Sequence, residues 1–374
     1  MKGKVYCFSR EPGGAEAVAL AVKGQPLSSY MIIGKDYACK VFSSHGLSCE
    51  QYRGSSPEEL SDYLDNFRKK VPVDAVLTSA SSIPEQDMTE KYMWEWASKR
   101  KVPSIAILDQ WQNYKERFSG PLGTEVCQYL PDVICAMDES ARQGMIRDGI
   151  PAERIKIVGH PSLSRLRQIM TRTNNKDIAE ARKKLKLKDT QKMILFVSEP
   201  FTDSYGDVAG YTELTILEEV LMYFQRRYSL ANNKDRIHLV IKRHPKNSPD
   251  AFNRFKGNRL IPMIISDEID KVPLLLASDL VIGMASIMLM ESIALGRPTV
   301  SVQVGAKMKD LCEAVNQKII PSISTHEEMT QLLDRLLDDS SYREQYIKDI
   351  KNYPIIHDAD KRIWKLIESR RLQS

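Results

Sequence analysis

Short, continuous apolar runs recur along this chain, and most are followed by a turn and then by a longer segment with helical spacing. Continuous rather than alternating apolar residues are typical of strands that are buried on both faces. Such strands form parallel sheets whose two faces are covered by helices. The pattern therefore predicts an α/β protein built on parallel sheets.

The apolar runs fall into two series, which predicts two Rossmann-like, doubly wound domains. The strands expected in the first series are Lys4–Ser9, Tyr30–Ile33, Ala75–Thr78, Ser104–Leu108 and Val133–Ala136. Those expected in the second series are Met193–Val197, His238–Lys242, Met263–Ser266, Leu280–Ile282 and Thr299–Val302. Helices are expected at Ala15–Lys23, after a tight turn at Pro12-Gly13-Gly14, and at Pro57–Lys69 and Asp87–Lys99.

The two series set the expected domain boundaries. We expect an N-terminal acceptor domain over residues 1–170 and a C-terminal nucleotide-donor domain over 192–352. A connector over 171–191 holds the basic run Arg182–Lys188, which we expect to be a solvated face, and a C-terminal helix over 353–374 is expected to return to the N-terminal domain. Two such domains commonly face each other across a cleft, and a ligand cleft is expected here.

Charge and cysteine content narrow the class of protein. The 374 residues carry 54 Lys and Arg against 49 Asp and Glu, a net charge of +5. This small excess does not predict nucleic-acid binding, which needs a clustered basic face, but it permits an anionic small ligand. The six cysteines form no C-x-x-C pair and no spacing typical of a zinc site, so we expect reduced thiols and no metal.

The chain carries no segment that predicts membrane insertion. Its least polar stretch, Leu280–Met290, is far shorter than the roughly 20 residues that span a bilayer. The N-terminal apolar run is cut off by Arg10 and Glu11, unlike a signal peptide. We expect a cytoplasmic protein, and the sequence leaves open peripheral association with the inner face of a membrane.

Two loops of the first domain are candidates for chemistry, because ligands of open parallel sheets bind beyond the carboxyl ends of the strands. Glu11 follows the first strand and could act as a general base, with Gly13 and Gly14 admitting a ligand close to the backbone. The alternative is a carboxylate that only stabilises a helix N-terminus. Asp109 begins a second loop, rich in aromatic and charged residues, that suits a hydroxylated or anionic ligand or else starts a helix with a solvated face.

Three loops of the second domain predict a phosphate and ribose site. Glu199 opens the first of them, as a nucleotide-facing residue or a structural cap. Lys242, Arg243 and His244 follow a strand and suit a diphosphate clamp.

The third loop leads from a strand into an apolar helix. Gly283 and Ser286 lie in its small-residue turn, where Ser286 and the neighbouring amides would face a phosphate at the helix N-terminus. Glu291 lies inside the helix and needs hydrogen-bond donors there, which ribose hydroxyls or a structural partner would supply. The chain has neither a G-x-G-x-x-G nor a G-x-x-x-x-G-K-[ST] motif, so the usual signals for dinucleotide and P-loop sites are missing.

The segments Asp138–Pro161, Lys242-Arg243-His244-Pro245 and Ser286–Pro298 together resemble the GT-B fold glycosyltransferases and their relatives. These relatives include the hydrolysing UDP-N-acetylglucosamine 2-epimerases and the CDP-glycerol glycerophosphotransferases of teichoic acid synthesis. The Val158-Gly159-His160-Pro161 segment and the loop at Glu11 are similar to features of lipid A disaccharide synthase. The D-S-G-G-x-x-E-E string of the 2-epimerases is absent, because Gly283-Met284-Ala285-Ser286 stands there instead.

The resemblance implies a metal-independent glycosyltransferase that extends a surface glycan or polysaccharide. Its donor would be a nucleotide-activated sugar or a CDP-activated group, used as substrate rather than cofactor, and its acceptor a glycan or a lipid-linked hydroxyl compound. Glu11 falls where several family members keep a catalytic base, with Asp109 as the alternative, while His244, Ser286 and Glu291 fall on the donor nucleotide. A nucleotide-sugar 2-epimerase or hydrolase and a non-catalytic binding module on the same fold are the alternatives.

Overall fold

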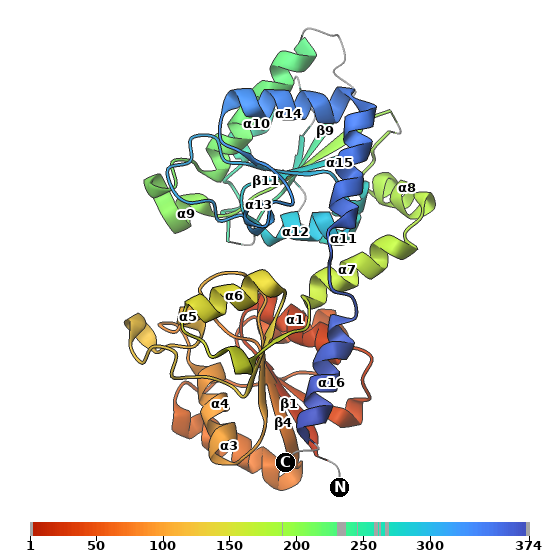
Figure 1. The fold of residues 1–374 in the computed structure, drawn as a ribbon. Helices are drawn as coiled ribbons and strands as arrows, with labels where there is room; N and C mark the ends of the chain where they lie inside the picture. Colours follow the sequence, from red (N-terminus) through yellow and green to blue (C-terminus); the bar gives the residue numbers. More distant parts are fainter. Residues whose placement is uncertain are drawn as a thin grey trace. The chain divides into compact units, whose positions relative to one another are not determined.

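The fold was analysed in a computed structural model that describes residues 3–188, 190–229, 237–244, 246–257, 261, 263–265 and 269–371. The chain divides into two compact units. The first unit comprises Met1–Arg165 and Ile355–Ser374, and the second comprises Leu166–Pro354. Each unit is built around one parallel sheet, as the apolar runs predict (Figure 1).

The sheet of the first unit has seven strands in the order β3-β2-β1-β4-β5-β6-β7, and every neighbouring pair is parallel. Its strands are β1 (Lys4–Ser9), β2 (Tyr30–Gly34), β3 (Glu50–Gln51), β4 (Val73–Thr78), β5 (Ser104–Ile107), β6 (Val133–Ala136) and β7 (Ile155–Ile157). The strand order reverses between β1 and β4, so the loops after these two strands diverge to opposite faces of the sheet.

The sheet of the second unit has six strands in the order β10-β9-β8-β11-β12-β13, again all parallel. Its strands are β8 (Lys192–Val197), β9 (Ile237–Lys242), β10 (Met263–Ile265), β11 (Leu280–Gly283), β12 (Thr299–Val302) and β13 (Ser322–Ile323). Here the order reverses between β8 and β11. The expected end of the third strand of this series, Ser266, lies outside the described residues.

Helices connect the strands in both units. Those of the first unit are α1 (Pro12–Val22), α2 (Ala38–Ser44), α3 (Pro57–Lys70), α4 (Thr89–Lys99), α5 (Tyr114–Arg117), α6 (Glu139–Arg147) and α16 (Ala359–Arg371). Those of the second are α8 (Asn175–Lys184), α9 (Phe201–Tyr205), α10 (Glu213–Ser229), α11 (Lys271–Ala277), α12 (Ile287–Ala294), α13 (Glu313–Asn316), α14 (His326–Asp338) and α15 (Ser340–Asn352). The division between the units falls within α7 (Pro161–Arg172).

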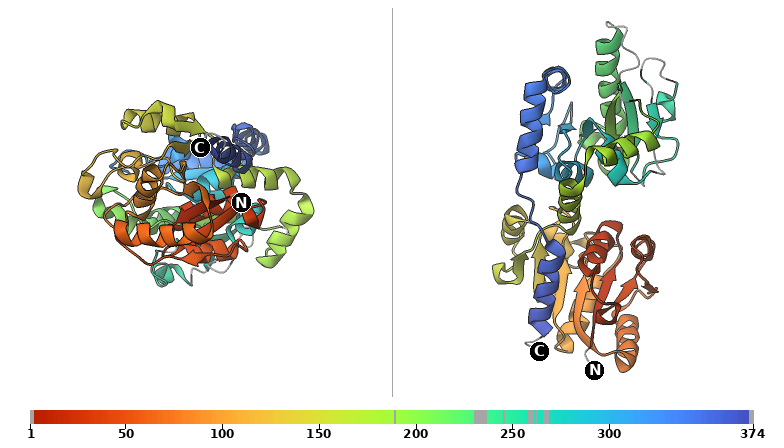
Figure 2. Two further views of the ribbon diagram at one scale, coloured as in Figure 1. Left: turned by 90° about the horizontal axis from the view of Figure 1, so that it is seen from below. Right: turned by 90° about the vertical axis from the view of Figure 1, so that its right-hand side faces the viewer.

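The helix α16 brings the end of the chain back to the first unit. It packs against α1 and β4, and its side chains Trp364 and Ile367 belong to the core on that side of the sheet. Arg371 near its end forms an ion pair of 2.5 Å with Asp74. The views of Figures 1 and 2 both place α16 beside the strands of this unit.

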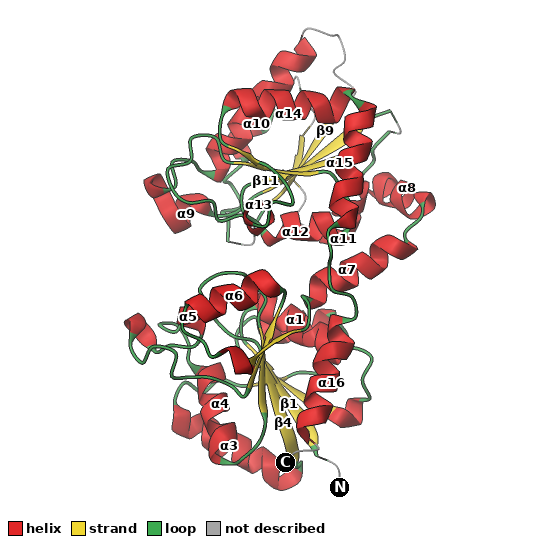
Figure 3. Cartoon of the chain, viewed as in Figure 1, coloured by secondary structure: helices red, strands yellow, loops and turns green. Residues whose placement is uncertain are grey.

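Both faces of the first sheet are covered. Along β1, Val5 and Cys7 join the core formed with α1 and α16, whereas Tyr6 and Phe8 join the core formed with α3 and α4. Figure 3 shows helices on either side of the strands. Burial on both faces explains why these strands consist of continuous apolar runs. In the described part of the chain, no helix combines the length and hydrophobicity needed to cross a bilayer.

Three expectations from the sequence need correction. Pro12, Gly13 and Gly14 do not form a turn before α1 but are its first three residues. Cys39 and Cys49 are not reduced thiols but form a disulfide, whose sulfurs lie over Gly34: a Cβ atom there would lie 2.6 Å from Cys49 Sγ. Neither feature has a spacing motif that sequence reasoning could have used.

The third correction concerns Arg182 alone in the basic run at 182–188, because Lys183, Lys184, Lys186 and Lys188 are exposed as expected. Arg182 does not lie on a solvated face, because its guanidinium is ion paired with Asp279 at 3.0 Å and donates to the carbonyl oxygen of Ala277. The helix α8, which carries Arg182, packs against α11. The segment 171–191 therefore belongs to the second unit and does not form a separate connector.

The disulfide provides a test of the first unit's stability. The disulfide joins residues with a sequence separation of 10. A Cys39→Ala/Cys49→Ala double variant lacks this link, and we expect its free energy of unfolding to be lower by about 2 to 3 kcal/mol. Calorimetry should show the first unit's transition at a lower temperature while the second unit's transition stays in place. Cys127→Ala, at a free cysteine, is the control. Equal transitions for the double variant and the wild type under oxidising conditions would contradict the pairing.

Candidate functional site

Polar side chains gather where the strand order of the first sheet reverses. Ser9 ends β1 and Ser79 follows β4, and their hydroxyl oxygens are hydrogen bonded at 2.7 Å. Both side chains are fully or almost fully buried. The carboxyl ends of β1 and β4 are thus joined at the position where ligands bind to sheets of this type.

Glu11 lies at this position, as the residue that precedes α1. Burial is the main cause that raises the pKa of its carboxyl group, and the nearby carboxylates of Glu90 and Asp109 raise it further. Arg117 and Arg10 act in the opposite direction. A raised pKa makes a carboxylate a stronger base, which favours its use as a general base.

Asp109, the other predicted base, is buried after β5 and is ion paired with Arg117 at 3.2 Å. A Cβ atom on Gly13 would lie 2.3 Å from its carboxylate oxygen, and one on Gly14 would lie 2.4 Å from the Cβ of Ser79. The two glycines therefore let α1 approach Asp109 and Ser79, rather than a ligand as the sequence suggested. Asp109 lies near enough to Glu11 to raise the pKa of its carboxyl group.

Glu90 and Arg117 organise this site; Arg117 belongs to the candidate loop that begins at Asp109, whereas sequence reasoning missed Glu90. Glu90 is 3% exposed, and its carboxylate accepts hydrogen bonds from the Ser79 hydroxyl and the Ser81 amide. Burial raises the pKa of Glu90. Arg117 is 2% exposed and donates to the carbonyl oxygen of Ala80 as well as to Asp109. A charged residue in the first turn of an amphipathic helix gives no signal that it is buried, so Glu90 does not stand out in the sequence.

His160 supports Asp109 from the loop before α7. Its imidazole stacks on Trp111 with ring centroids 5.5 Å apart. The amide of Ser162 donates to Nδ1, which leaves Nε2 to donate to the carbonyl oxygen of Asp109 at 3.1 Å. With both nitrogens engaged in this way, His160 is a neutral residue that fixes the backbone of Asp109.

In the second unit, Glu199 joins the loops that follow β8 and β11, where the strand order reverses. Its carboxylate accepts a hydrogen bond of 2.7 Å from the amide of Ala285. Burial raises the pKa of Glu199 to about 7, with a smaller contribution from Glu213, while the bond from Ala285 opposes the shift. This carboxyl group therefore changes charge close to neutral pH, at a place where backbone amides would face a phosphate.

His244 lies in the loop after β9 and is held by a buried network. Asn247 accepts from the His244 amide at 3.1 Å and from the Ser198 hydroxyl at 2.8 Å, and it donates to Glu213 at 3.1 Å. Glu213 also accepts from the amide and the hydroxyl of Thr202. Burial, together with nearby Lys246, lowers the pKa of the His244 imidazole. Asn247 and Glu213 were not predicted from the sequence.

Lys242 and Arg243, predicted to clamp a diphosphate, both reach backbone carbonyl oxygens. Lys242 donates to Ile269 at 3.1 Å and Arg243 to Ser248 at 3.1 Å. Pro245 of the same motif lies outside the described residues. The structure thus places these cations at the carboxyl end of β9, as expected, with part of their hydrogen-bonding capacity used by the protein.

The helix α12 begins as predicted, with Ser286 at its N-cap accepting from the Met288 amide at 3.3 Å. Gly283 ends β11, and a Cβ atom there would lie 3.0 Å from Leu289, so the glycine allows close helix packing. Glu291 is 3% exposed, and one of its oxygens pairs with Lys271 at 2.6 Å. Its other oxygen is buried and has no hydrogen-bond partner among the described residues.

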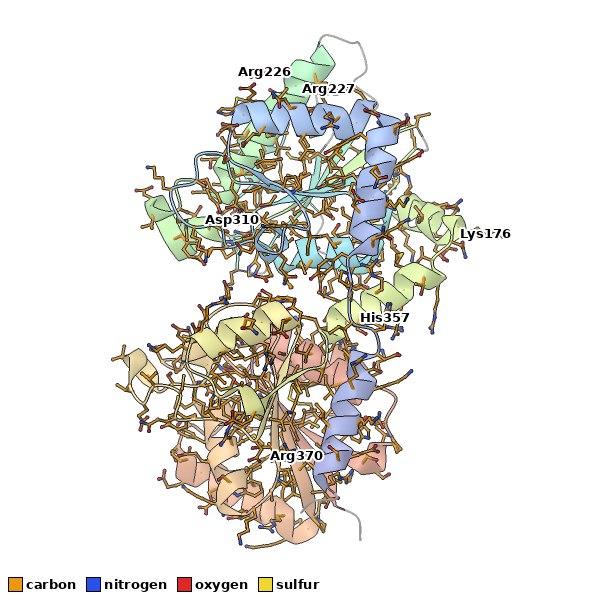
Figure 4. The ribbon with its side chains drawn as sticks, in the orientation of Figure 1. Lys176, Arg226, Arg227, Asp310, His357 and Arg370 are labelled. Atoms are coloured by element: carbon orange, nitrogen blue, oxygen red, sulfur yellow. A yellow bond between two sulfur atoms is a disulfide. The ribbon has the colours of Figure 1, made fainter. Side chains whose placement is uncertain are left out.

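Two further features bear on the type of site. Among the described residues, no group of three or more His, Cys, Asp or Glu side chains is arranged to hold a metal ion. A pocket of about 420 Å³ lies between α10 and α14, and its ionic side chains already pair with one another, as Arg227 does with Asp334 and His326 with Glu219. Figure 4 labels Arg226 and Arg227 on α10 at this pocket, which contains none of the predicted site residues.

The chain is similar in sequence to one family and in fold to several solved structures. Residues 102–358 match the family model described as "Protein of unknown function (DUF354)". None of the curated proteins matches.

The structural relatives share the fold over the whole chain. The UDP-GlcNAc 2-epimerase of Neisseria meningitidis bound to UDP-GlcNAc has a TM-score of 0.67 and 14% identity, covering 98% of this chain and 100% of that one. That of Methanocaldococcus jannaschii has a TM-score of 0.69 and 12% identity, covering 98% and 99%. Anabaena Alr3699/HepE in complex with UDP and glucose has a TM-score of 0.63 and 12% identity, covering all of both chains. These similarities confirm the predicted GT-B fold; those to lipid A disaccharide synthase and the glycerophosphotransferases stay predictions.

The raised pKa of Glu199 has a consequence for stability. The carboxyl group of Glu199 has a pKa of about 7 in the folded protein, against an ordinary value of 4.5, so it binds more protons when folded. Stability should therefore fall as pH rises from about 4.5 to 7, by on the order of 3 kcal/mol. Glu199→Gln, which keeps an acceptor for Ala285, should remove this slope from the second unit's melting temperature between pH 5 and 8. The exposed Asp203→Asn variant should keep it; a slope unchanged in Glu199→Gln would show that the pKa is not raised.

Proposed function

This chain belongs to the DUF354 family, whose description assigns no activity, and we propose that it is a glycosyltransferase. In this proposal it moves a sugar from a nucleotide-activated donor to a hydroxyl acceptor during synthesis of a bacterial-type surface glycan or polysaccharide. Structural relatives whose titles name bound UDP, UDP-GlcNAc or UDP and glucose support a nucleotide-sugar ligand.

The observation that carries the proposal is the buried, unpartnered oxygen of Glu291. A buried carboxylate oxygen without a donor costs free energy, and Lys271 serves only the other oxygen. Because a carboxylate only accepts hydrogen bonds, its missing partner must be a donor such as a hydroxyl group. The hydroxyls of a ribose ring fit this requirement, and Ser286 at the start of the same helix lies one and a half turns away, where a phosphate would be favoured.

The remaining roles follow from where the side chains lie. Glu11, or Asp109 beside it, would take the proton from the acceptor hydroxyl in the first unit. In the second unit, Lys242, Arg243 and His244 after β9 would stabilise the leaving phosphate together with the N-terminus of α12. Cations and a helix N-terminus neutralise developing charge without a metal ion, which is why we propose a metal-independent transfer.

A 2-epimerase or hydrolase is the second candidate, favoured by the titles of two structural relatives that are UDP-GlcNAc 2-epimerases. It differs in needing no acceptor: the same donor would be cleaved and its sugar released as the C2 epimer or unchanged. The absence of the D-S-G-G-x-x-E-E string from the loop at Gly283 argues against the epimerase.

Incubation with UDP-GlcNAc or UDP-glucose alone, followed by analysis of free UDP and sugar, separates these candidates. The transferase should release UDP rapidly only when an acceptor is added. Glu11→Gln should lower turnover by roughly 10²-fold to 10⁴-fold, the usual contribution of a general base, and leave UDP binding unchanged. Rapid turnover without any acceptor would overturn the transferase, and full activity of Glu11→Gln would remove Glu11 from the mechanism.

Donor binding can be tested separately through Glu291. We expect Glu291→Ala to weaken UDP binding by about 1.5 to 3 kcal/mol, the contribution of a hydrogen bond to a charged group. Glu291→Gln should lose less, because its amide oxygen still accepts. Titration calorimetry with UDP, CDP, CMP and GDP measures the effect and identifies the base. The exposed Glu344→Ala variant is the control, and equal UDP affinity for Glu291→Ala and wild type would contradict the proposed ribose contact.

A further inference from the structure

The disulfide between Cys39 and Cys49 lies at the carboxyl end of β2. A Cβ atom on Gly34, the last residue of β2, would lie 2.8 Å from Cys39 Sγ and 2.6 Å from Cys49 Sγ. Cys39 is the second residue of α2, and Cys49 directly precedes β3. One covalent bond therefore fixes the start of α2 and the start of β3 against the end of β2.

The turn between β2 and α2 reaches the candidate site of the first unit. It begins at Lys35, whose amide donates to the carbonyl oxygen of Ser9 at the end of β1, at 3.1 Å. The next residue, Asp36, accepts a hydrogen bond of 2.6 Å from Nε of Arg10. Arg10 is in turn ion paired with Glu11, with Nη1 and the carboxylate oxygen 4.0 Å apart. Asp36 thus holds the cation that lies beside the proposed base.

Asp36 depends on its surroundings to keep this position. Its φ is 49°, in the left-handed region that residues other than glycine rarely adopt. Such a conformation is costly and persists only where the surrounding structure enforces it. The turn is short, and the disulfide fixes its far end at Cys39. We therefore expect Asp36 to relax when the disulfide opens.

Opening the bond need not unfold the unit. The helix α2 stays anchored through Ala38 and Phe42, which are fully buried in the core formed with α1. In contrast, β3 has two residues, lies at the edge of the sheet and pairs with β2 at two positions. Loss of the disulfide should therefore loosen β3 and the turn before α2 while the core remains packed.

The cysteine content favours a reversible bond. Both Cys39 and Cys49 are partly exposed, so a thiol in solution can reach their sulfurs. The other four cysteines are free, three of them buried and one, Cys127, partly exposed. Free thiols persist in reducing compartments, where a disulfide is usually transient, catalytic or redox-sensing.

We propose that the Cys39–Cys49 disulfide is a redox switch of the first unit, which a dithiol opens and which determines whether Arg10 stays on Asp36 or moves to Glu11. A thiolate of the dithiol attacks one sulfur, and the other cysteine leaves as a thiolate. The second thiol of the reductant then displaces the first cysteine from the mixed disulfide. Two electrons pass to the cysteines, the reductant becomes a disulfide, and the two protons from its thiols go to the cysteine thiolates.

The open form should have a weaker base. Burial raises the pKa of Glu11, and Arg10 opposes this shift. Once released from Asp36, Arg10 can pair more closely with Glu11 and stabilise its carboxylate, which makes Glu11 less able to take a proton. The oxidised protein is therefore the active form. This catalytic consequence rests on the proposed function, whereas the structural change at Arg10 does not.

The structural step can be tested on the full-length protein without substrate. The folded protein is treated with dithiothreitol and alkylated, and mass spectrometry should find Cys39 and Cys49 modified. Hydrogen exchange over residues 35–52 should become faster on reduction. The NMR signal of the Arg10 Nε–H group, assigned by its loss in Arg10→Lys, should shift because the bond to Asp36 is lost.

The catalytic step is tested by turnover with a nucleotide sugar and an acceptor. Reduction should lower turnover by up to about a hundredfold, the cost of misplacing a catalytic group. Reoxidation should restore it, and UDP affinity should stay unchanged. Cys39→Ser/Cys49→Ser should resemble the reduced protein under all conditions, and Asp36→Asn should be slow even when oxidised. Cys127→Ser, at a free cysteine, is the control and should respond to reduction as the wild type does.

Several outcomes would overturn the switch. One is a disulfide that resists dithiothreitol in the folded protein, and another is an Arg10 signal that reduction does not change. Loss of the first unit's melting transition on reduction would show that the bond is purely structural. Turnover that stays constant while the Arg10 signal shifts would remove the effect on Glu11. Absence of turnover in both redox states, with the Arg10 response intact, would count against the proposed function and leave the switch supported.

Discussion

The parallel pairing of β1 with β4 and of β8 with β11 determines where each unit can bind a ligand. At these two pairs the strand order reverses, so the following loops run to opposite faces of the sheet. In the first unit Ser9 and Ser79 join across the reversal, and in the second Glu199 reaches the amide of Ala285. Each link bridges strand ends that are adjacent in space and distant in sequence.

Polar groups at these strand ends are buried because helices cover both sheet faces, and burial controls their chemistry. The carboxyl groups of Glu11, Glu90 and Glu199 all have raised pKa values, chiefly through desolvation. Hydrogen bonds from backbone amides compensate in part for Glu90 and Glu199. The result is a set of fixed carboxyl groups, of which that of Glu199 changes protonation near neutral pH.

The sequence was sufficient to predict the two sheets, and the ends predicted for β1, β6 and β12 match the structure residue by residue. It did not predict β3, β7 and β13, which have two or three residues and too little periodicity to recognise. Predicted site residues such as Glu11 and Ser286 come soon after predicted strands. Their place at the strand ends therefore follows from the order of residues along the chain. Glu90 and Lys271 escaped prediction because their roles depend on contacts between separate helices and loops, which no local pattern encodes.

The buried, unpartnered oxygen of Glu291 in the second unit calls for a particular ligand chemistry. A carboxylate oxygen can only accept a hydrogen bond, so its partner must donate one, as a sugar hydroxyl does. An apolar side chain at this position would avoid the cost of burying the group. Retention of a carboxylate there is the pattern expected where a ligand supplies the missing donor.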